Sequence, residues 1–283
     1  MKIGKLLFLG LIFCFAVQVS KSQKIESPIM PEENVVYDWE LGGFIGIGSN
    51  FNSGTYTAEC PECLFDDASK FGFSIGVKMD YEILRWFYIG ANLIYDNESV
   101  DGAFRRIESI PLTRGDGSIM DVPVEFRHVM NLKLNSFTLA PNAIFRIDDW
   151  LDIRLGFYTD FLFGSNITHT KELLTKTAVL PDGEKVNVTI PNTKNNIAEL
   201  ENHAIPGLSS TVFGLFPQIN INIPISDGSD FIIGSYLKMP FSAISSQQSN
   251  FKIDVWRFFL GLSFDLNDAN AYRAKVDAIK NKK

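Results

Sequence analysis

Phe71–Tyr81 reads FGFSIGVKMDY and is the stretch that decides the fold of this chain. Its odd positions are large and apolar, whereas its even positions are Gly, Ser, Lys or Asp. A period of two places the apolar side chains on one face of a β-strand and the polar ones on the other. The stretch therefore predicts a strand that lies between an apolar and a polar environment.

The same alternation recurs in eight stretches, and the connections between them alternate in length. The predicted strands are 37–51, 70–81, 85–97, 131–147, 150–164, 208–225, 230–243 and 251–266. Tight turns at Glu82–Leu84, Asp148–Asp149 and Ser226–Ser229 alternate with the loops 52–69, 98–130, 165–207 and the shorter 244–250. This pattern predicts an all-β fold: an eight-stranded antiparallel up-and-down transmembrane β-barrel with long extracellular loops and tight periplasmic turns.

A soluble barrel of the lipocalin type also alternates, so other features are needed to place the chain in a membrane. The strands are long, and the loops differ strongly in length between the two ends. Trp39, Trp86 and Trp150 fall at the predicted periplasmic ends, as in an interfacial aromatic girdle, although the last two have the parity of the lumen face. Together these features favour the membrane-spanning barrel.

The polar face carries acidic and basic groups in nearly equal numbers. They are Glu40, Lys78, Asp80, Asp96, Arg146, Asp152, Arg154, Asp160, Lys238, Arg257 and Asp265. An eight-stranded barrel is just wide enough for its own side chains to fill. We therefore expect a paired charge network that plugs the lumen, rather than an open channel.

The N-terminus has the features of a secretory leader. Lys2 and Lys5 precede an apolar run from Leu6 to Val19, and small residues precede Gln23. We expect a signal peptide at 1–22, a periplasmic segment at 23–36, the barrel at 37–266 and a short basic periplasmic tail at 267–283. Gly261, Phe264 and Leu266 fit the terminal-strand pattern that marks outer-membrane barrels for insertion.

Composition narrows the choice of partners. The net charge of −7 and the pI near 5.1 argue against a nucleic-acid partner, which needs a basic surface. The 24 Phe and 21 Gly suit a lipid-facing surface and closely packed strands. The predicted location is the outer membrane of a diderm bacterium, with its lipid and possible envelope proteins as partners.

Several local features refine the strand assignment. Pro141 and Pro217 lie inside predicted strands, where proline usually marks an edge or a bulge, so we expect bulges there. Gly-containing turn sequences predict hairpins at 107–129 and 176–190. Residues 197–203 are compatible with a short helix that Asn195 or Asn196 caps.

The order of these parts resembles the small outer-membrane β-barrel domain of Bacteroidota, often described as PorT-like. The matching pieces are Cys60-Pro61-Glu62-Cys63 followed by Phe71–Gly76, then Gly117–Ile119 through Val124–His128, Leu139–Pro141 and Trp256–Gly261. The resemblance runs over nearly the whole mature chain. It implies the fold and the location, and it brings no catalytic residues.

Few residues suggest chemistry. Cys60 and Cys63 are candidates for a disulfide in an extracellular loop. The only histidines are His128, His169 and His203; they could converge above the barrel mouth, but solvated loop histidines are more common than a metal site, so we predict no metal ion and no cofactor. The conceivable catalytic sets pair His169 with Asp160 or Ser165, and His203 with Ser209 or Ser210, and no recognisable motif surrounds them. We therefore predict no catalytic residues.

The long loops remain the best candidates for a functional surface, because long ordered loops are usually functional. The leading hypothesis is a non-enzymatic barrel that presents an extracellular platform as an accessory subunit of an envelope complex. The alternatives are a surface hydrolase that acts on lipid or peptide, and a narrow pore for small solutes.

Overall fold

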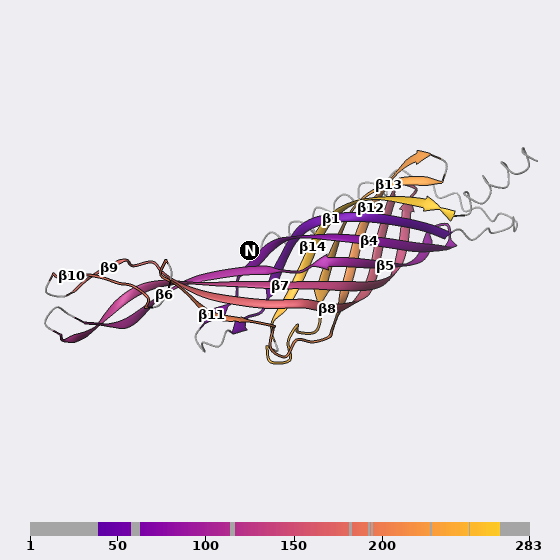
Figure 1. Ribbon diagram of the computed structural model, residues 1–283. Coiled ribbons are helices and arrows are strands. Elements are labelled where there is room, and N and C mark those ends of the chain that lie inside the picture. Colours follow the sequence, from indigo (N-terminus) through magenta and orange to yellow (C-terminus); the bar gives the residue numbers. More distant parts are fainter. Residues whose placement is uncertain are drawn as a thin grey trace, which may run out of the picture. The chain divides into compact units, whose positions relative to one another are not determined.

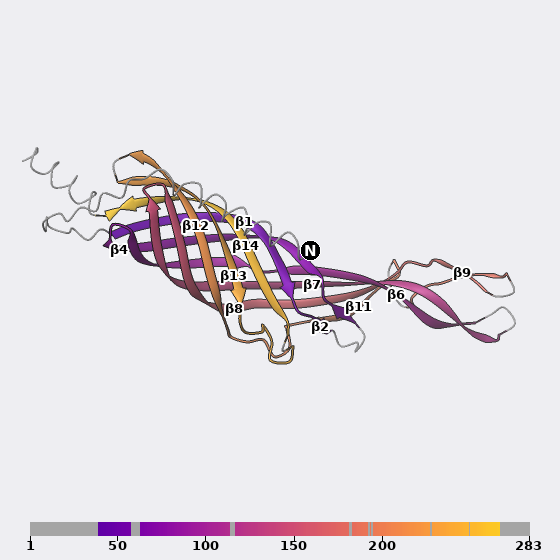
Figure 2. The same cartoon turned by 180° about the vertical axis from the view of Figure 1, so that it is seen from behind.

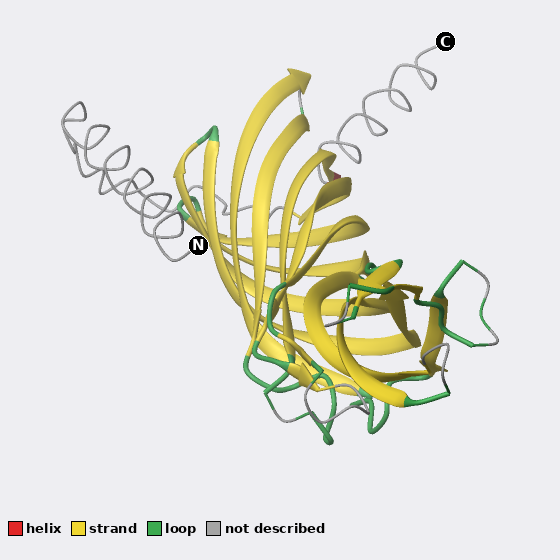
Figure 3. Cartoon of the chain, turned by 90° about the vertical axis from the view of Figure 1, so that its left-hand side faces the viewer, coloured by secondary structure: helices red, strands yellow, loops and turns green. Residues whose placement is uncertain are grey.

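The computed structural model describes residues 39–57, 63–113, 117–180, 183–191, 193, 195–226, 228–248 and 250–266. The predicted leader at 1–22, the segment 23–36, the tail 267–283 and Cys60 lie outside these residues. Almost all of the described chain is strand, joined by turns and loops (Figure 3). Within the described ranges, no helix is long and apolar enough to cross a membrane.

Eight antiparallel strands form a closed ring (Figures 1 and 2). They are β1 (Trp39–Ser53), β4 (Ala68–Leu84), β5 (Phe87–Asn97), β7 (Ile119–Asp148), β8 (Leu151–Leu173), β12 (Thr211–Ser226), β13 (Ser229–Pro240) and β14 (Lys252–Asp265). The ring runs β8-β12-β13-β14-β1-β4-β5-β7, and the pairing of β7 with β8 closes it. The predicted eight-stranded antiparallel barrel is confirmed, and all eight predicted strands are present.

The outer face of the ring is a band of exposed apolar side chains. In β4 the outward residues Phe71, Ile75 and Met79 are 65%, 55% and 46% exposed, whereas the intervening polar residues are buried or half-buried. Trp86 and Trp150 are also exposed, which corrects the expected lumen parity: both lie in the tight turns, where the strand alternation no longer applies. Only a lipid environment removes so continuous an apolar band from water.

Pro141 and Pro217 sit within regular strands, so the expected bulges are wrong. Pro141 pairs with Ala91 of β5 and Pro217 pairs with Leu155 of β8, each in an unshifted register. On its other side, Pro141 has no register partner in β8, and Pro217 has none in β13. The residue pairs before and after each proline keep the same register. The ladder tolerates the loss of one proline bond because the pairings on both sides of it hold the register.

Beyond the ring, β7 and β8 continue into a smaller sheet at the long-loop end. We call it the outer sheet: β6 (Val100–Thr113), the first part of β7, the last part of β8, and β11 (Ile197–His203). The short strands β2 (Tyr56–Thr57), β3 (Leu64–Phe65), β9 (Thr177–Val179) and β10 (Lys185–Asn187) form two further hairpins. The hairpin expected at 107–129 is confirmed as β6–β7, and that at 176–190 as β9–β10.

Residues 197–203 form strand β11, so the expected short helix is wrong. β11 pairs with the free edge of β8, which offers it backbone hydrogen bonds along its length. Asn195 and Asn196 both have positive φ, at 60° and 57°. These left-handed residues turn the chain into the strand instead of capping a helix.

Three apolar clusters fill the interior. One lies within the ring and includes Phe44, Tyr158, Phe216, Tyr236 and Phe259. A second fills the long-loop end of the ring and includes Tyr56, Phe65, Met130, Ile167 and Phe251. The third lies farthest out, where Val122, Val124 and Phe126 pack against Ala178, Leu180 and Val188 around β9–β10. The outer sheet thus has an apolar core of its own.

Candidate functional site

The lumen holds one ionic group toward the short-turn end. Arg154 of β8 donates both terminal nitrogens to Asp80 of β4, at 2.9 and 2.8 Å, and also reaches Asp152 at 3.3 Å. Lys78 adds a second cation to Asp80, at 2.9 Å. The fork of a guanidinium matches the two oxygens of a carboxylate, so Arg154 holds β4 and β8 together across the lumen.

The same group continues to the short-turn end of the barrel through Glu40 and Arg146. Arg146 donates to Glu40 at 3.0 Å, to Asp152 at 3.0 Å and to the Tyr88 hydroxyl at 2.9 Å. Glu40 also accepts from Lys78 at 3.4 Å. Each of these charges therefore has an opposite charge beside it, as a buried ionic network requires.

A second ionic group lies toward the long-loop end. Arg257 of β14 donates to Asp96 at 2.5 and 3.1 Å. Lys238 of β13 contacts Asp160 at 2.8 Å and forms a short ion pair with Glu98. Arg257 and Lys238 are 0% and 1% exposed. Along the strands, the aromatic cluster around Phe44 and Tyr236 lies between the two ionic groups.

All the residues of the expected lumen network are buried or half-buried, and nearly all of them pair within these two groups. Asp265 lies at the end of β14, half-buried opposite Glu40 in the β1–β14 register. Glu98 was missed, because it follows the strand predicted at 85–97 by one residue. Glu98 has the same parity as Asp96, the last polar-face residue of that predicted strand, and this could have indicated that it also faces the lumen.

Gly261, Phe264 and Leu266 stand at the end of the last strand. Gly261 is buried against Phe44, where a Cβ would meet the backbone oxygen of Gly43 at 2.6 Å. Phe264 and Leu266 are exposed on the apolar band. Their role as an insertion signal stays a prediction.

Outside the apolar band, the base of the outer sheet gathers two histidines and two carboxylates. His128 comes from β7, His169 from β8, Glu108 from β6 and Glu201 from β11. Cys63, just before β3, lies beside His128. His128, His169 and Cys63 are at most 1% exposed. We call these five residues the histidine cluster; the two histidines converge as the sequence suggested they could.

A bulge turns His169 toward this cluster. In the ring, odd-numbered residues of β8 such as Phe161 and Phe163 face outward, which by simple alternation would also place His169 outside. The β7–β8 register shifts between the pairs Asn135–Phe163 and Lys133–Asn166. Gly164 has φ of 62° at this point, as in a bulge that begins with a left-handed glycine. The extra residue reverses the parity, and His169 becomes an inward side chain.

The distances within the histidine cluster are short. Nδ1 of His128 lies 3.0 Å from Nε2 of His169 and 3.7 Å from Sγ of Cys63. The other ring nitrogens face carboxylates: Nε2 of His128 lies 3.1 Å from Glu108, and Nδ1 of His169 lies 3.7 Å from Glu201. Phe104 stacks on His128 at 4.8 Å, and Phe65 meets His169 edge-on at 5.4 Å.

Burial controls the protonation of the two imidazoles. It lowers the pKa of His128 and of His169, although Glu108 and Glu201 oppose the effect. Burial alone would raise the pKa of Glu108, but its bonds to Lys171 and His128 outweigh that effect and hold the pKa below its usual range. The Lys171 ammonium lies 2.5 Å from the Glu108 carboxylate. The site therefore pairs neutral imidazoles with an ionised Glu108 near pH 7.

The other expected pairs of chemical groups are placed differently. Asp160 lies in the lumen against Lys238 and Thr138, whereas His169 contacts His128 and Glu201. His203 lies 3.9 Å from Glu201 and contacts the backbone oxygen of Ala204. Cys63 is disulfide-bonded. Its expected partner Cys60 lies outside the described residues, so the Cys60–Cys63 pairing stays a prediction.

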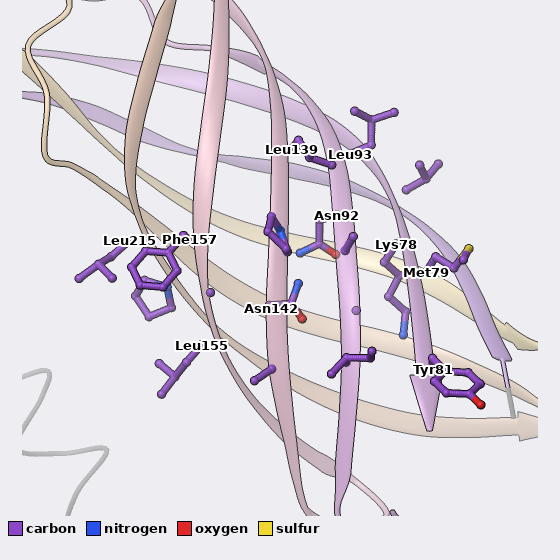
Figure 4. Close-up of a pocket in the computed structure, with 18 of the residues that line it drawn as sticks. Lys78, Met79, Tyr81, Asn92, Leu93, Leu139, Asn142, Leu155, Phe157 and Leu215 are labelled. Carbon is purple, nitrogen blue, oxygen red and sulfur yellow. The ribbon is translucent and has the colours of Figure 1, made fainter. Parts of the chain in front are cut away.

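The apolar band contains a shallow hollow of about 1170 Å³ (Figure 4). Its lining includes larger side chains such as Leu93, Leu139 and Phe157 and the small Ala91 and Ala143. Outward-facing apolar side chains dominate its lining, so the hollow belongs to the lipid-facing surface.

A closed ring of eight antiparallel strands, apolar outside and ionic inside, defines an outer-membrane β-barrel. No known protein family matches the chain, and no curated protein does either. Its described fold is similar to that of Neisserial surface protein A, at 11% identity and a TM-score of 0.36, with 80% of this chain and 96% of that chain covered.

Two further solved structures show a similar likeness. Ail, the attachment invasion locus protein of Yersinia pestis, is 8% identical with a TM-score of 0.30 over 79% of this chain and 98% of that one. The outer membrane protease OmpT of Escherichia coli is 10% identical with a TM-score of 0.27 over 85% and 100%. Likenesses at these identities and scores say nothing of activity.

Proposed function

We propose that this protein is a non-enzymatic outer-membrane platform that acts as an accessory subunit of an envelope complex. The observation that carries the proposal is the continuity of β7 and β8, which run unbroken from the membrane ring into the outer sheet. A sheet so built, with its own apolar core, presents its surface in a fixed position. Such pre-organisation lowers the entropic cost of binding a partner. We also propose membership of the Bacteroidota PorT-like family.

The lumen supports a structural role. Two ionic groups and an aromatic cluster occupy the ring from one end to the other, and the cluster around Tyr56 and Phe251 fills its long-loop end. Side chains of this size leave an eight-stranded barrel little room for a solute path. We accordingly expect negligible single-channel conductance in planar bilayers, and well-resolved openings would favour the pore alternative.

A shortened hairpin tests the platform directly. Glu108 and Val124 are register partners, so an Asn-Gly turn can replace Ser109–Pro123 and still close the β6–β7 hairpin. Wild type purified in mild detergent from native outer membranes should retain a stoichiometric protein partner, and the shortened variant should lose it. Heat-modifiable migration of both proteins controls for barrel folding. A wild-type barrel that purifies alone, or a partner that the shortened variant retains, would contradict the proposal.

A further inference from the structure

Three donor atoms of the histidine cluster, from Cys63, His128 and His169, lie within 4.8 Å of one another. The outer ring nitrogens of the cluster face acceptors: Nε2 of His128 faces Glu108, and Nδ1 of His169 faces Glu201. Ionised carboxylates accept hydrogen bonds only, so they favour the tautomers that carry protons on these outer nitrogens. The inner nitrogens, Nδ1 of His128 and Nε2 of His169, then present lone pairs to each other across 3.0 Å. Two facing lone pairs repel, and a cation between them removes the repulsion.

Carboxylate support of this kind is typical of metal sites. Histidines that bind a metal ion nearly always donate the other ring N–H to a carboxylate, carbonyl or water, which fixes the tautomer and the ring orientation. Here both histidines face a carboxylate on that side. Phe65 and Phe104 pack on the two rings and provide an apolar wall.

The third donor is the sulfur of Cys63. It lies 3.7 Å from Nδ1 of His128, and the donor atoms of Cys63, His128 and His169 are all within 4.8 Å of one another. Tetrahedral zinc bonds imply edges of about 3.6 Å for sulfur–nitrogen and about 3.3 Å for nitrogen–nitrogen. The observed 3.7 and 3.0 Å differ from these two edges by only a few tenths of an ångström, and the third edge, from Cys63 to His169, is within 4.8 Å.

We propose that reduction of the Cys63 disulfide converts the histidine cluster into a Zn²⁺ site, with the Cys63 thiolate, Nδ1 of His128 and Nε2 of His169 as its ligands. Thiolate and imidazole are the donors that zinc prefers, whereas a disulfide sulfur is a poor ligand. A dithiol donor supplies two electrons and two protons to open the disulfide and itself becomes a disulfide. Zn²⁺ then displaces the thiol proton of Cys63. Bound metal would tie the segment before β3 to β7 and β8 at the base of the outer sheet.

Zinc affinity of the full-length barrel in detergent, before and after reduction, tests this site. Competition with a chromophoric chelator should show one Zn²⁺ bound per reduced chain and no comparable binding to the oxidised chain. Cys60→Ser, which removes the expected disulfide partner, should bind Zn²⁺ without any reductant, and Cys63→Ser should not bind. Co²⁺ in place of Zn²⁺ should give the absorption of a thiolate-bound tetrahedral ion in the reduced wild type.

Variants of the supporting residues separate ligation from general electrostatics. Glu201→Gln removes the carboxylate behind His169 and should weaken zinc binding about 10–100-fold. His203→Gln is the matched control: it lies on the same strand β11, 3.9 Å from Glu201, but is not one of the proposed ligands, so the affinity should not change. The proposal is wrong if the reduced chain binds no zinc, if the oxidised chain binds equally well, or if Cys63→Ser binds like the wild type. If the reduced chain binds no zinc, the 3.0 Å contact between His128 and His169 is an ordinary hydrogen bond between the two imidazoles.

Discussion

The two halves of β7 place their apolar side chains on opposite faces of the same strand. In the ring, its outward side chains include the exposed Phe137, Leu139 and Phe145, while Thr138 and Asn142 face the lumen. In the outer sheet, Arg127 and Lys133 face outward, and apolar side chains such as Met130 face inward. The alternation of β7 continues unchanged, but the polarity of its two faces inverts near Asn135. The surrounding solvent, lipid in one half and water in the other, accounts for the inversion.

The ionic interior of the ring should be far more sensitive to the loss of a charge than the surface of the outer sheet. Arg154→Met removes the two-pronged partner of Asp80 and one of the two arginines on Asp152; both carboxylates are at most 1% exposed. Lys78 and Arg146 then remain as two cations against the three carboxylates of Glu40, Asp80 and Asp152. We expect the free energy of unfolding to fall by about 3–5 kcal/mol, because breaking a buried pair leaves an uncompensated charge. Tryptophan fluorescence during urea unfolding in lipid vesicles measures the loss.

Arg127→Met provides the comparison in the outer sheet. Arg127 is half-exposed and lies 3.9 Å from Glu172, so its removal should cost about 0–1 kcal/mol. Equal effects of the two substitutions would mean that the lumen is hydrated enough to screen its charges, and the plugged barrel would have to be abandoned.

A new charge on the outward face tests where the lipid ends. Ile75 lies in the middle of the apolar band and Ile107 on the outward face of β6; they are 55% and 69% exposed. Ile75→Arg should destabilise the barrel by about 2–4 kcal/mol, the cost of a cation at the bilayer midplane. Ile107→Arg should change stability by no more than about 0.5 kcal/mol, as surface substitutions in water do. The same urea titration distinguishes them, and a large effect at Ile107 would place the outer sheet against lipid.

The ring was predictable from the sequence because lipid and lumen impose a strict period of two on every strand. Each of the eight strands, including 70–81 and 150–164, was recognised from this alternation. Outside the membrane the signal weakens, since water tolerates mixed side chains on an exposed face. The sequence of residues 197–203 is therefore compatible with a short helix, because only the free edge of β8 dictates their extended conformation.

From the sequence, the histidine cluster could be predicted only to the extent that the three histidines could converge. Its histidines and carboxylates come from β6, β7, β8 and β11, which strand pairing brings together, and Cys63 comes from the segment before β3. Unbroken alternation along β8 would point His169 outward, and the bulge at Gly164 reverses its direction. A glycine directly after Phe161-Leu162-Phe163, at the edge of the apolar band, was the available signal. A bulge depends on the partner strand as well as on its own sequence, so one strand alone does not reveal it.

The bulge itself can be weakened by a side chain at Gly164. An L residue at φ of 62° is strained, so Gly164→Val should cost about 1–2 kcal/mol, and Gly164→Asn should cost less because asparagine visits this region more readily. Chemical denaturation measures the stability, and histidine NMR signals report whether His169 remains beside His128. If Val is tolerated as well as Asn and the histidine signals do not move, the positive φ at Gly164 is not what orients His169.

The smallest expected effect is a pH dependence confined to the outer sheet. Burial lowers the pKa of His128 and His169 in the folded protein, so the unfolded chain, with histidine pKa values of about 6.5, binds more protons in mild acid. The contribution of the two buried histidines to folding stability is thus complete above the unfolded pKa. It is lost as the pH falls toward their lower pKa values in the folded protein.

Hydrogen exchange of the metal-free, oxidised protein, corrected for intrinsic rates, should show protection in the outer parts of β7 and β8 declining between pH 7.5 and 5. His128→Gln should reduce this slope. Protection of the lumen-lining strand segments should stay constant, since the three histidines lie outside them. An equal decline of protection in the ring would instead show that the outer sheet and the ring open as one cooperative unit. The two halves of β7 would then not be stabilised independently.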